Sequence, residues 1–283
     1  MNSGVKIYTP DAKQKIGFFQ TWGIMLRNII QSRDLIWQLF KRDFLATYKK
    51  SYLGVGWVLV SPIIGIISWV LLNSANILQP GDTPIPYLPY VLISSTIWGL
   101  FMGFYGSAAG TLGAGAGFIM QVKYPHEVLL VKQIAQQLAN FLITFGINII
   151  VLLLFGITPD WKILLFPILM LPMLFLGAGI GLIVSVISIV ATDLTNFINI
   201  GLGFVFYVTP IVYAATRPEG LFRTIVQINP LTYLVGGVRD LIVTGTMEYP
   251  DRFIIFSIAS FIFFLLAWRF FFVSEDKVIE KIF

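Results

Sequence analysis

Long apolar stretches dominate the chain, and short polar or charged segments separate them. Six of these stretches are long enough, at about 17 residues or more, to cross a bilayer as a helix. They cover residues 55–78, 90–111, 134–155, 163–190, 198–214 and 253–273. We therefore expect an all-α integral membrane protein with six transmembrane helices.

A segment with a different pattern precedes the first span and reads RDLIWQLFKRDFLATYKKSYLGVGW over residues 33–57. On a helical wheel its apolar residues share one broad face, and its polar and basic residues gather on the other. The apolar face holds Leu35, Ile36, Trp37, Leu39, Phe40 and Phe44, and the polar face holds Gln38, Lys41 and Arg42. This pattern predicts an amphipathic helix in the bilayer interface, with its apolar face in lipid.

Asp43 interrupts that helix, because its position falls inside the apolar arc. A carboxylate in such a place requires a partner. Two partners are open: Arg42 of the same helix, or a group on another subunit.

Two short apolar segments, 221–228 and 231–243, lie before the last span and are too short to cross a bilayer. Asn229 and Pro230 separate them as a helix stop followed by an N-cap and a first helical residue. We interpret residues 219–245 as a re-entrant helical hairpin. Two interfacial helices on the surface are the alternative.

The second span carries glycines that project onto one narrow face: Gly99, Gly103, Gly106, Gly110, Gly113 and Gly117. Such spacing favours the close approach of another helix backbone. A smooth wall for a sliding polymer is the alternative interpretation.

The third span carries a polar stripe: Gln133, Gln137, Asn140, Thr144 and Asn148. Exposing these groups to lipid is costly, so the stripe must face protein or water. Hydrogen bonding between helices is favoured over the lining of a hydrophilic conduit.

The composition agrees with a membrane protein, since 12% of residues are charged, against about 25% in soluble domains. The chain has no cysteine and one histidine, so we expect no metal site. It contains no P-loop, no buried carboxylate pair and no basic domain that would hold nucleic acid. We therefore expect no catalytic residues. The spans also hold essentially no ionisable group at mid-depth, where ion-coupled transporters place them, so we expect a separate ATPase as the energy source.

Six spans place both termini on one side. Only five of the 19 Lys and Arg residues fall on the opposite side: Lys162, Arg217, Arg223, Arg239 and Arg252. The positive-inside rule then makes both termini cytoplasmic. The chain divides into a tail with the amphipathic helix (1–52), a transmembrane domain (53–273) and a second cytoplasmic tail (274–283).

Three groups of residues resemble the membrane subunit of bacterial ATP-binding-cassette polysaccharide exporters, a type-2 ABC permease family that moves O-antigen, capsule or teichoic-acid chains. The first group is Arg42, Asp43, Tyr48, Lys49, Lys50, Ser51, Leu53, Gly54, Trp57 and Pro62. The second is Lys123, Tyr124 and Pro125 after the second span. The third is Asn229, Pro230, Leu231 and Arg239. The resemblance covers nearly the whole chain.

The resemblance implies a role for each group. Residues Arg42, Asp43, Tyr48, Lys49, Lys50 and Ser51 would form an interfacial gate that meets the lipid pyrophosphate. Residues Lys123, Tyr124, Pro125, His126 and Glu127 would dock in the ATPase. Asn229, Pro230 and Arg239 would belong to the hairpin near the channel exit.

The resemblance also implies an assembly in the bacterial inner membrane: a homodimer of this chain with two copies of an ABC ATPase, which binds ATP and Mg. The cargo would be an undecaprenyl-linked polysaccharide, with O-antigen favoured, in a channel between the two copies. Aromatic rings suit sugar faces, and the candidates are Trp57, Trp69, Phe204, Tyr207 and Tyr233.

Two other functions remain open. A drug or small-lipid exporter of the same fold would not need a wide aromatic conduit. A membrane-embedded glycosyl- or acyltransferase acting on lipid-linked substrates would need an acid–base cluster, which the sequence lacks.

Overall fold

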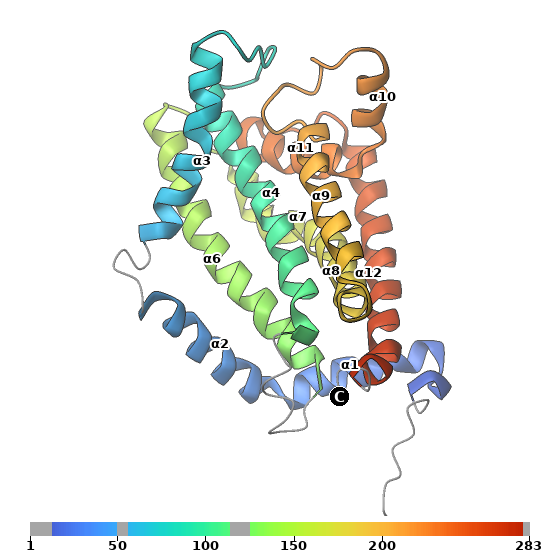
Figure 1. Ribbon diagram of the computed structural model, residues 1–283. Helices are drawn as coiled ribbons and strands as arrows, with labels where there is room; N and C mark the ends of the chain where they lie inside the picture. The colour runs from blue at the N-terminus through green and yellow to red at the C-terminus, as the bar shows by residue number, and fades with distance from the viewer. Residues whose placement is uncertain (1–12, 50–55, 114–124, 280–283) are drawn as a thin grey trace, which may run out of the picture.

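A computed structural model describes residues 13–49, 56–113 and 125–279, and every regular element in these ranges is helical. Figure 1 shows a bundle of roughly aligned helices with further helices at each end. The bundle contains α3 (Gly56–Ser74), α4 (Tyr87–Ala109), α6 (Glu127–Leu154), α8 (Leu171–Val190), α9 (Thr192–Val208) and α12 (Pro250–Ile279). One end carries α1 (Phe18–Gln31) and α2 (Arg33–Lys49), and the other carries α10 (Gly220–Ile228) and α11 (Pro230–Thr244). We call these the α1–α2 end and the α10–α11 end.

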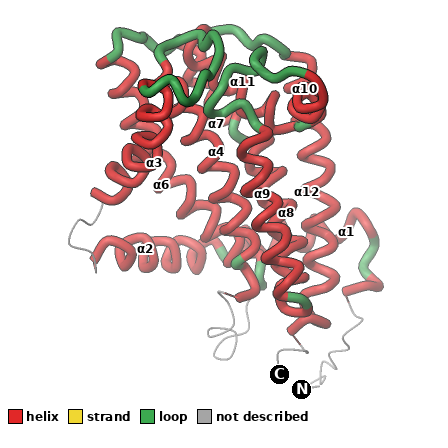
Figure 2. Tube along the Cα trace, turned by 45° about the horizontal axis from the view of Figure 1, so that its top comes forward, coloured by secondary structure: helices red, strands yellow, loops and turns green. Residues whose placement is uncertain are grey.

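The described residues contain four helical segments long and apolar enough to cross a membrane: Tyr87–Ala109, Glu127–Leu154, Trp161–Val190 and Pro250–Ser274. They confirm the all-α membrane class. The first and fifth predicted spans correspond to α3 and α9, which have 19 and 17 residues. That α3 and α9 also cross the membrane stays a prediction. In Figure 2 the longer loops gather at the α10–α11 end.

The fifth span differs from its prediction at both ends. Residues 192–197, which precede the predicted span, are helical, so α9 begins at Thr192. At its other end the helix stops at Val208, before the predicted end of the span at residue 214. Thr209 has extended backbone angles, φ −94° and ψ 133°, and a residue that precedes proline disfavours the helical region.

The fourth span is interrupted near its start. A 3-10 helix, η2 (Trp161–Leu165), is followed by the short α7 (Phe166–Leu169) and then by α8. Pro167 and Pro172 each lie in the first turn of a helix, where a missing N–H is tolerated. At the other end of the chain, residues 274–279 of the predicted tail continue α12 as a helix.

Helix α8 packs closely on α4 and α12. A Cβ atom added at Gly177 would lie 2.7 Å from the carbonyl oxygen of Phe101, and Gly181 is in similar contact with Tyr105. A Cβ at Gly179 would lie 2.8 Å from the ring of Phe263 on α12. Small residues on α8 therefore allow the close helix contacts.

The predicted close packing on the glycine face of α4 is wrong within this chain. Space is open within 4 Å of a Cβ atom at Gly99, Gly106 and Gly113. At Gly103 a Cβ would collide with the side chain of Gln137 on α6. Gly117 lies outside the described residues. Most of this face is thus left open.

Candidate functional site

The amphipathic helix α2 packs partly on protein. Leu39 is buried in a cluster with Val128 and Leu129 of α6, and Leu35 and Ile36 pack against it. The prediction that the whole apolar face lies in lipid is therefore wrong for these three leucine and isoleucine positions. Trp37 remains 63% exposed, so one side of the face is still open.

Asp43 has its partners within this chain. Arg42 Nε donates to Asp43 Oδ1 at 2.7 Å, as one of the two predictions had it. Lys132 Nζ of α6 donates to Asp43 Oδ2 at 2.8 Å, and the side chain of Lys132 is only 10% exposed. Partial burial alone would raise the pKa of Asp43, but the hydrogen bonds and charges of Arg42 and Lys132 outweigh it. The pKa lies below its ordinary value of 3.8.

The predicted ATPase-coupling segment adjoins this pair. His126 and Glu127 are buried at the first turn of α6, and Asn28 Nδ2 of α1 donates to Glu127 Oε1 at 3.5 Å. Pro125 is half-buried, while Lys123 and Tyr124 lie outside the described residues. Burial of His126 and Glu127 means that they hold α6 against its neighbours.

The end of α12 reaches the same corner. Arg269 Nη1 donates to Thr21 Oγ1 of α1 at 2.6 Å, and its guanidinium lies 4.7 Å from the centre of the Phe18 ring. At the α1–α2 end, the start of α1 is thus joined to α12, and α1 and α2 are both joined to the start of α6. Of the predicted gate, Tyr48 and Lys49 belong to the last turn of α2, and Lys50 and Ser51 lie outside the described residues.

The predicted break between two short helices at the α10–α11 end is confirmed. Asn229 is the N-cap of α11: its side-chain oxygen accepts from Leu231 N at 3.0 Å, and Pro230 is the first helical residue. Asn229 Nδ2 also donates to Thr209 Oγ1 at 2.9 Å. The cap therefore links the two-helix unit to the end of α9.

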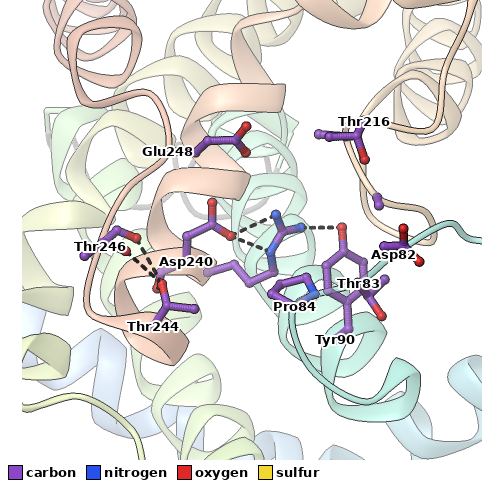
Figure 3. Close-up of a pocket in the computed structure, with 12 residues that line it drawn as sticks. Asp82, Thr83, Pro84, Tyr90, Thr216, Asp240, Thr244, Thr246 and Glu248 are labelled. Atoms are coloured by element: carbon purple, nitrogen blue, oxygen red, sulfur yellow. Dashed lines mark hydrogen bonds and ion pairs between the residues drawn. The ribbon is translucent and has the colours of Figure 1, made fainter.

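Arg239 fastens this unit to the bundle. It is 6% exposed, and its Nη1 donates to the hydroxyl of Tyr90 on α4 at 2.8 Å and to Pro210 O at 3.1 Å. Asp240 lies on the other side of the guanidinium, 3.0 Å from Nη2 (Figure 3). Burial raises the pKa of Asp240 above its ordinary value, although Arg239 opposes this.

A cavity of about 500 Å³ opens beside Arg239. Asp82, Asp240 and Glu248 are its acidic lining residues (Figure 3). In the described ranges no three His, Asp or Glu residues lie close enough together to hold a metal ion. The contacts of Arg239 join α11 to α4 and to the segment after α9.

The candidate channel aromatics do not form one wall. Trp69 lies against Tyr207, with ring centres 6.4 Å apart, and Phe204 is exposed on the same helix as Tyr207. Tyr233 is elsewhere, stacked on Phe256 of α12 at 5.3 Å. Trp57 belongs to the first turn of α3. Phe206 was not among the candidates, yet its ring centre lies 6.2 Å from that of Trp69.

A second cavity, of about 400 Å³, lies near the middle of α4 and α6. Three residues of the polar stripe, Gln137, Asn140 and Thr144, line one side of it. Gly99 of α4 lines it too, and Trp69 and Phe206 close it on the aromatic side. The structure brings the stripe, the glycine face and two aromatic rings to one place, which no single sequence pattern indicated.

Comparison with known proteins agrees with this architecture. The chain is 24% identical over 213 residues to the O-antigen export system permease protein RfbA of Myxococcus xanthus, and the aligned region covers 75% of this chain and 81% of that protein. It is 26% identical over 222 residues to a protein of the same name from Klebsiella pneumoniae, covering 76% and 83%. The sequence profile described as ABC-2 type transporter matches residues 34–243, from α2 through the bundle to α11. This chain belongs to the ABC-2 type transporter family.

Proposed function

We propose that the chain is the transmembrane subunit of an ATP-driven exporter that moves lipid-linked O-antigen across the bacterial inner membrane. The observation that carries the proposal is the similarity to two proteins named as O-antigen export permeases over three quarters of the chain. The chain itself supplies no ATP site, and a separate ABC ATPase with bound Mg would provide the energy.

The proposed working unit is a homodimer with two ATPase copies. Large apolar side chains stand exposed along one face of α9, at Phe197, Ile200, Phe204 and Tyr207. The spacing of three or four residues makes this a continuous stripe, and a second copy would cover it. A passage for the cargo would run between the two copies, and the open glycine face of α4 would line it.

The α1–α2 end would face the cytoplasm and the ATPase. Five cations were predicted to lie on the side opposite the termini. They belong to the α10–α11 end or its flanking loops: Lys162, Arg217, Arg223, Arg239 and Arg252. An orientation with both termini cytoplasmic then satisfies the positive-inside rule. The two helices α10 and α11 would form the re-entrant hairpin at the exit.

Inactivation of the gene tests the proposal. We expect loss of surface O-antigen and accumulation of lipid-linked chains inside the cell, both reversed by the intact gene. Unchanged surface polysaccharide with altered drug sensitivity would instead indicate a small-molecule exporter. Purification with a tagged copy should recover the ATPase and a second copy of this chain, and a fully active isolated monomer would contradict the assembly.

A further inference from the structure

We infer that the cavity between α3, α4 and α6 is a seat for a neutral sugar ring inside each protomer. The inference rests on the proposed function and names a substrate contact that the channel aromatics alone do not provide. The cavity volume of about 400 Å³ lies within the range of roughly 300–1,000 Å³ that small-molecule sites have in proteins.

The chemistry of the lining selects the ligand class. Gln137 and Asn140 offer amide donors and acceptors, and Thr144 and Ser95 offer hydroxyl groups. None of the lining residues is charged, so the cavity does not favour a phosphate or a cation. A polyhydroxylated neutral molecule can exchange hydrogen bonds with these amides and hydroxyls, and a lipid chain cannot.

The aromatic side of the cavity fits the same ligand. The rings of Phe206 and Tyr207 lie against Trp69, with centres 6.2 and 6.4 Å away, and hold its orientation. A pyranose ring has an apolar C–H face that packs on an indole and hydroxyl edges that reach amides. The lining therefore matches both aspects of a sugar ring.

Two glycines of α4 make room for this arrangement. A Cβ atom at Gly103 would collide with Gln137 Nε2, so glycine there allows the amide to lie against α4. At Gly99, by contrast, a Cβ atom meets nothing within 4 Å, although the residue lines the cavity. A larger side chain at Gly99 would fill the cavity without displacing the backbone.

The absence of cysteine from the chain permits a direct test by single-cysteine labelling. Thr144→Cys places a thiol in the cavity, and Gly146→Cys places one on the opposite side of α6 by helical position. The complete complex with its ATPase, in membrane vesicles, is treated with a small water-soluble thiol reagent. We expect Thr144→Cys to react about tenfold faster, since thiolates form poorly in lipid.

Protection then identifies the occupant. A lipid-linked oligosaccharide, trapped on the complex without ATP hydrolysis, should slow labelling of Thr144→Cys, and the same lipid without sugar should not. Equal protection by both would indicate a lipid site and overturn the inference. If neither the lipid-linked oligosaccharide nor the lipid without sugar slows the labelling, the cavity holds only water and the inference is likewise overturned.

A cavity-filling pair gives an independent measurement in cells. Gly99→Leu should lower export to roughly one tenth or less, because a filled pocket rejects its ligand. Gly146→Leu, also in open space, should export normally. Normal export by Gly99→Leu, in a strain where deletion abolishes surface O-antigen, would refute the sugar seat and leave the proposed function intact. Normal O-antigen in the deletion strain would refute the function itself.

Discussion

Lys132 and Asp43 are 89 positions apart in the sequence, yet Lys132 Nζ lies 2.8 Å from Asp43 Oδ2 and donates a hydrogen bond to it. The pair joins α2 to the second turn of α6, directly beside the buried His126 and Glu127. A displacement of the start of α6 would therefore move α2 with it. This ion pair directly joins the helix that follows the proposed ATPase contact to the helix that carries the proposed gate.

Replacing Asp43 with Asn should uncouple hydrolysis from export. The change leaves Lys132, which is 10% exposed, without a counter-charge, and we expect a loss of about 1–3 kcal/mol of stability at this junction. Export should fall while the purified complex still hydrolyses ATP. Lys132→Met should have the same effect, and the double variant should be no worse than either single one.

The control for this prediction lies on the same helix. Asp34 and Arg33 form an ion pair at 3.9 Å with both side chains more than four fifths exposed. Exposed pairs contribute little, so Asp34→Asn should change neither export nor stability. Normal coupling in Asp43→Asn would show that α2 moves independently of α6.

The Asp43 contact should also depend on pH. Its pKa is lowered in the folded protein, so its contribution to stability is complete above the ordinary value of 3.8. As the pH falls below 3.8 the carboxylate becomes protonated and the contribution is lost. The melting-temperature difference between wild type and Asp43→Asn should stay constant from roughly pH 7 to 5 and close below that range. A difference that persists under strongly acid conditions would contradict the ion-pair explanation.

Arg239→Met should detach the α10–α11 unit from the bundle. The variant removes the cation between Tyr90 and Asp240 and leaves a buried carboxylate, at a cost of about 3–5 kcal/mol. The stability of Arg239→Lys should lie between those of the wild type and Arg239→Met, because an ammonium group cannot satisfy the same set of acceptors. Thermal unfolding in detergent measures both.

The matched control is Arg223→Met. Arg223 lies on α10 and is exposed, so its loss should change stability by no more than about 0.5 kcal/mol. Equal melting temperatures for Arg239→Met and Arg223→Met would mean that the buried network does not hold the unit in place.

Gly181→Ala should push α8 away from α4. Its new methyl group would meet the carbonyl oxygen of Tyr105, and we expect a loss of about 1–3 kcal/mol of stability. Gly146→Ala adds the same methyl group to open space on α6, and should be neutral or stabilising by up to about 1 kcal/mol. Comparing the two variants by thermal unfolding separates helix propensity from packing, and equal stabilities would exclude the close α8–α4 contact.

The long apolar segments could be predicted from sequence because hydrophobic length is a local property. The two-helix unit before the last span could be predicted for a similar reason, since Asn229 and Pro230 stop one helix and start the next by local geometry. The end of the fifth span was predicted too late, because the residue before Pro210 leaves the helical conformation and α9 ends at Val208 rather than near residue 214.

Contacts between helices could not be read from the chain. Six glycines on one face of α4 indicated close packing, but the glycines that meet the backbone of a neighbouring helix are on α8. The reason is that spacing shows which residues share a face, while the neighbour of that face depends on how all the helices assemble. Lys132 was missed as the partner of Asp43 for the same reason.

The sequence by itself determined that this chain is helical and lies in a membrane, because backbone polar groups and a lipid environment leave few other solutions for such an apolar chain. Only the tertiary structure decided that the amides of α6, the open glycine of α4 and the ring of Trp69 share one cavity. Side chains from four helices meet there, and no local pattern encodes which faces of separate helices come together.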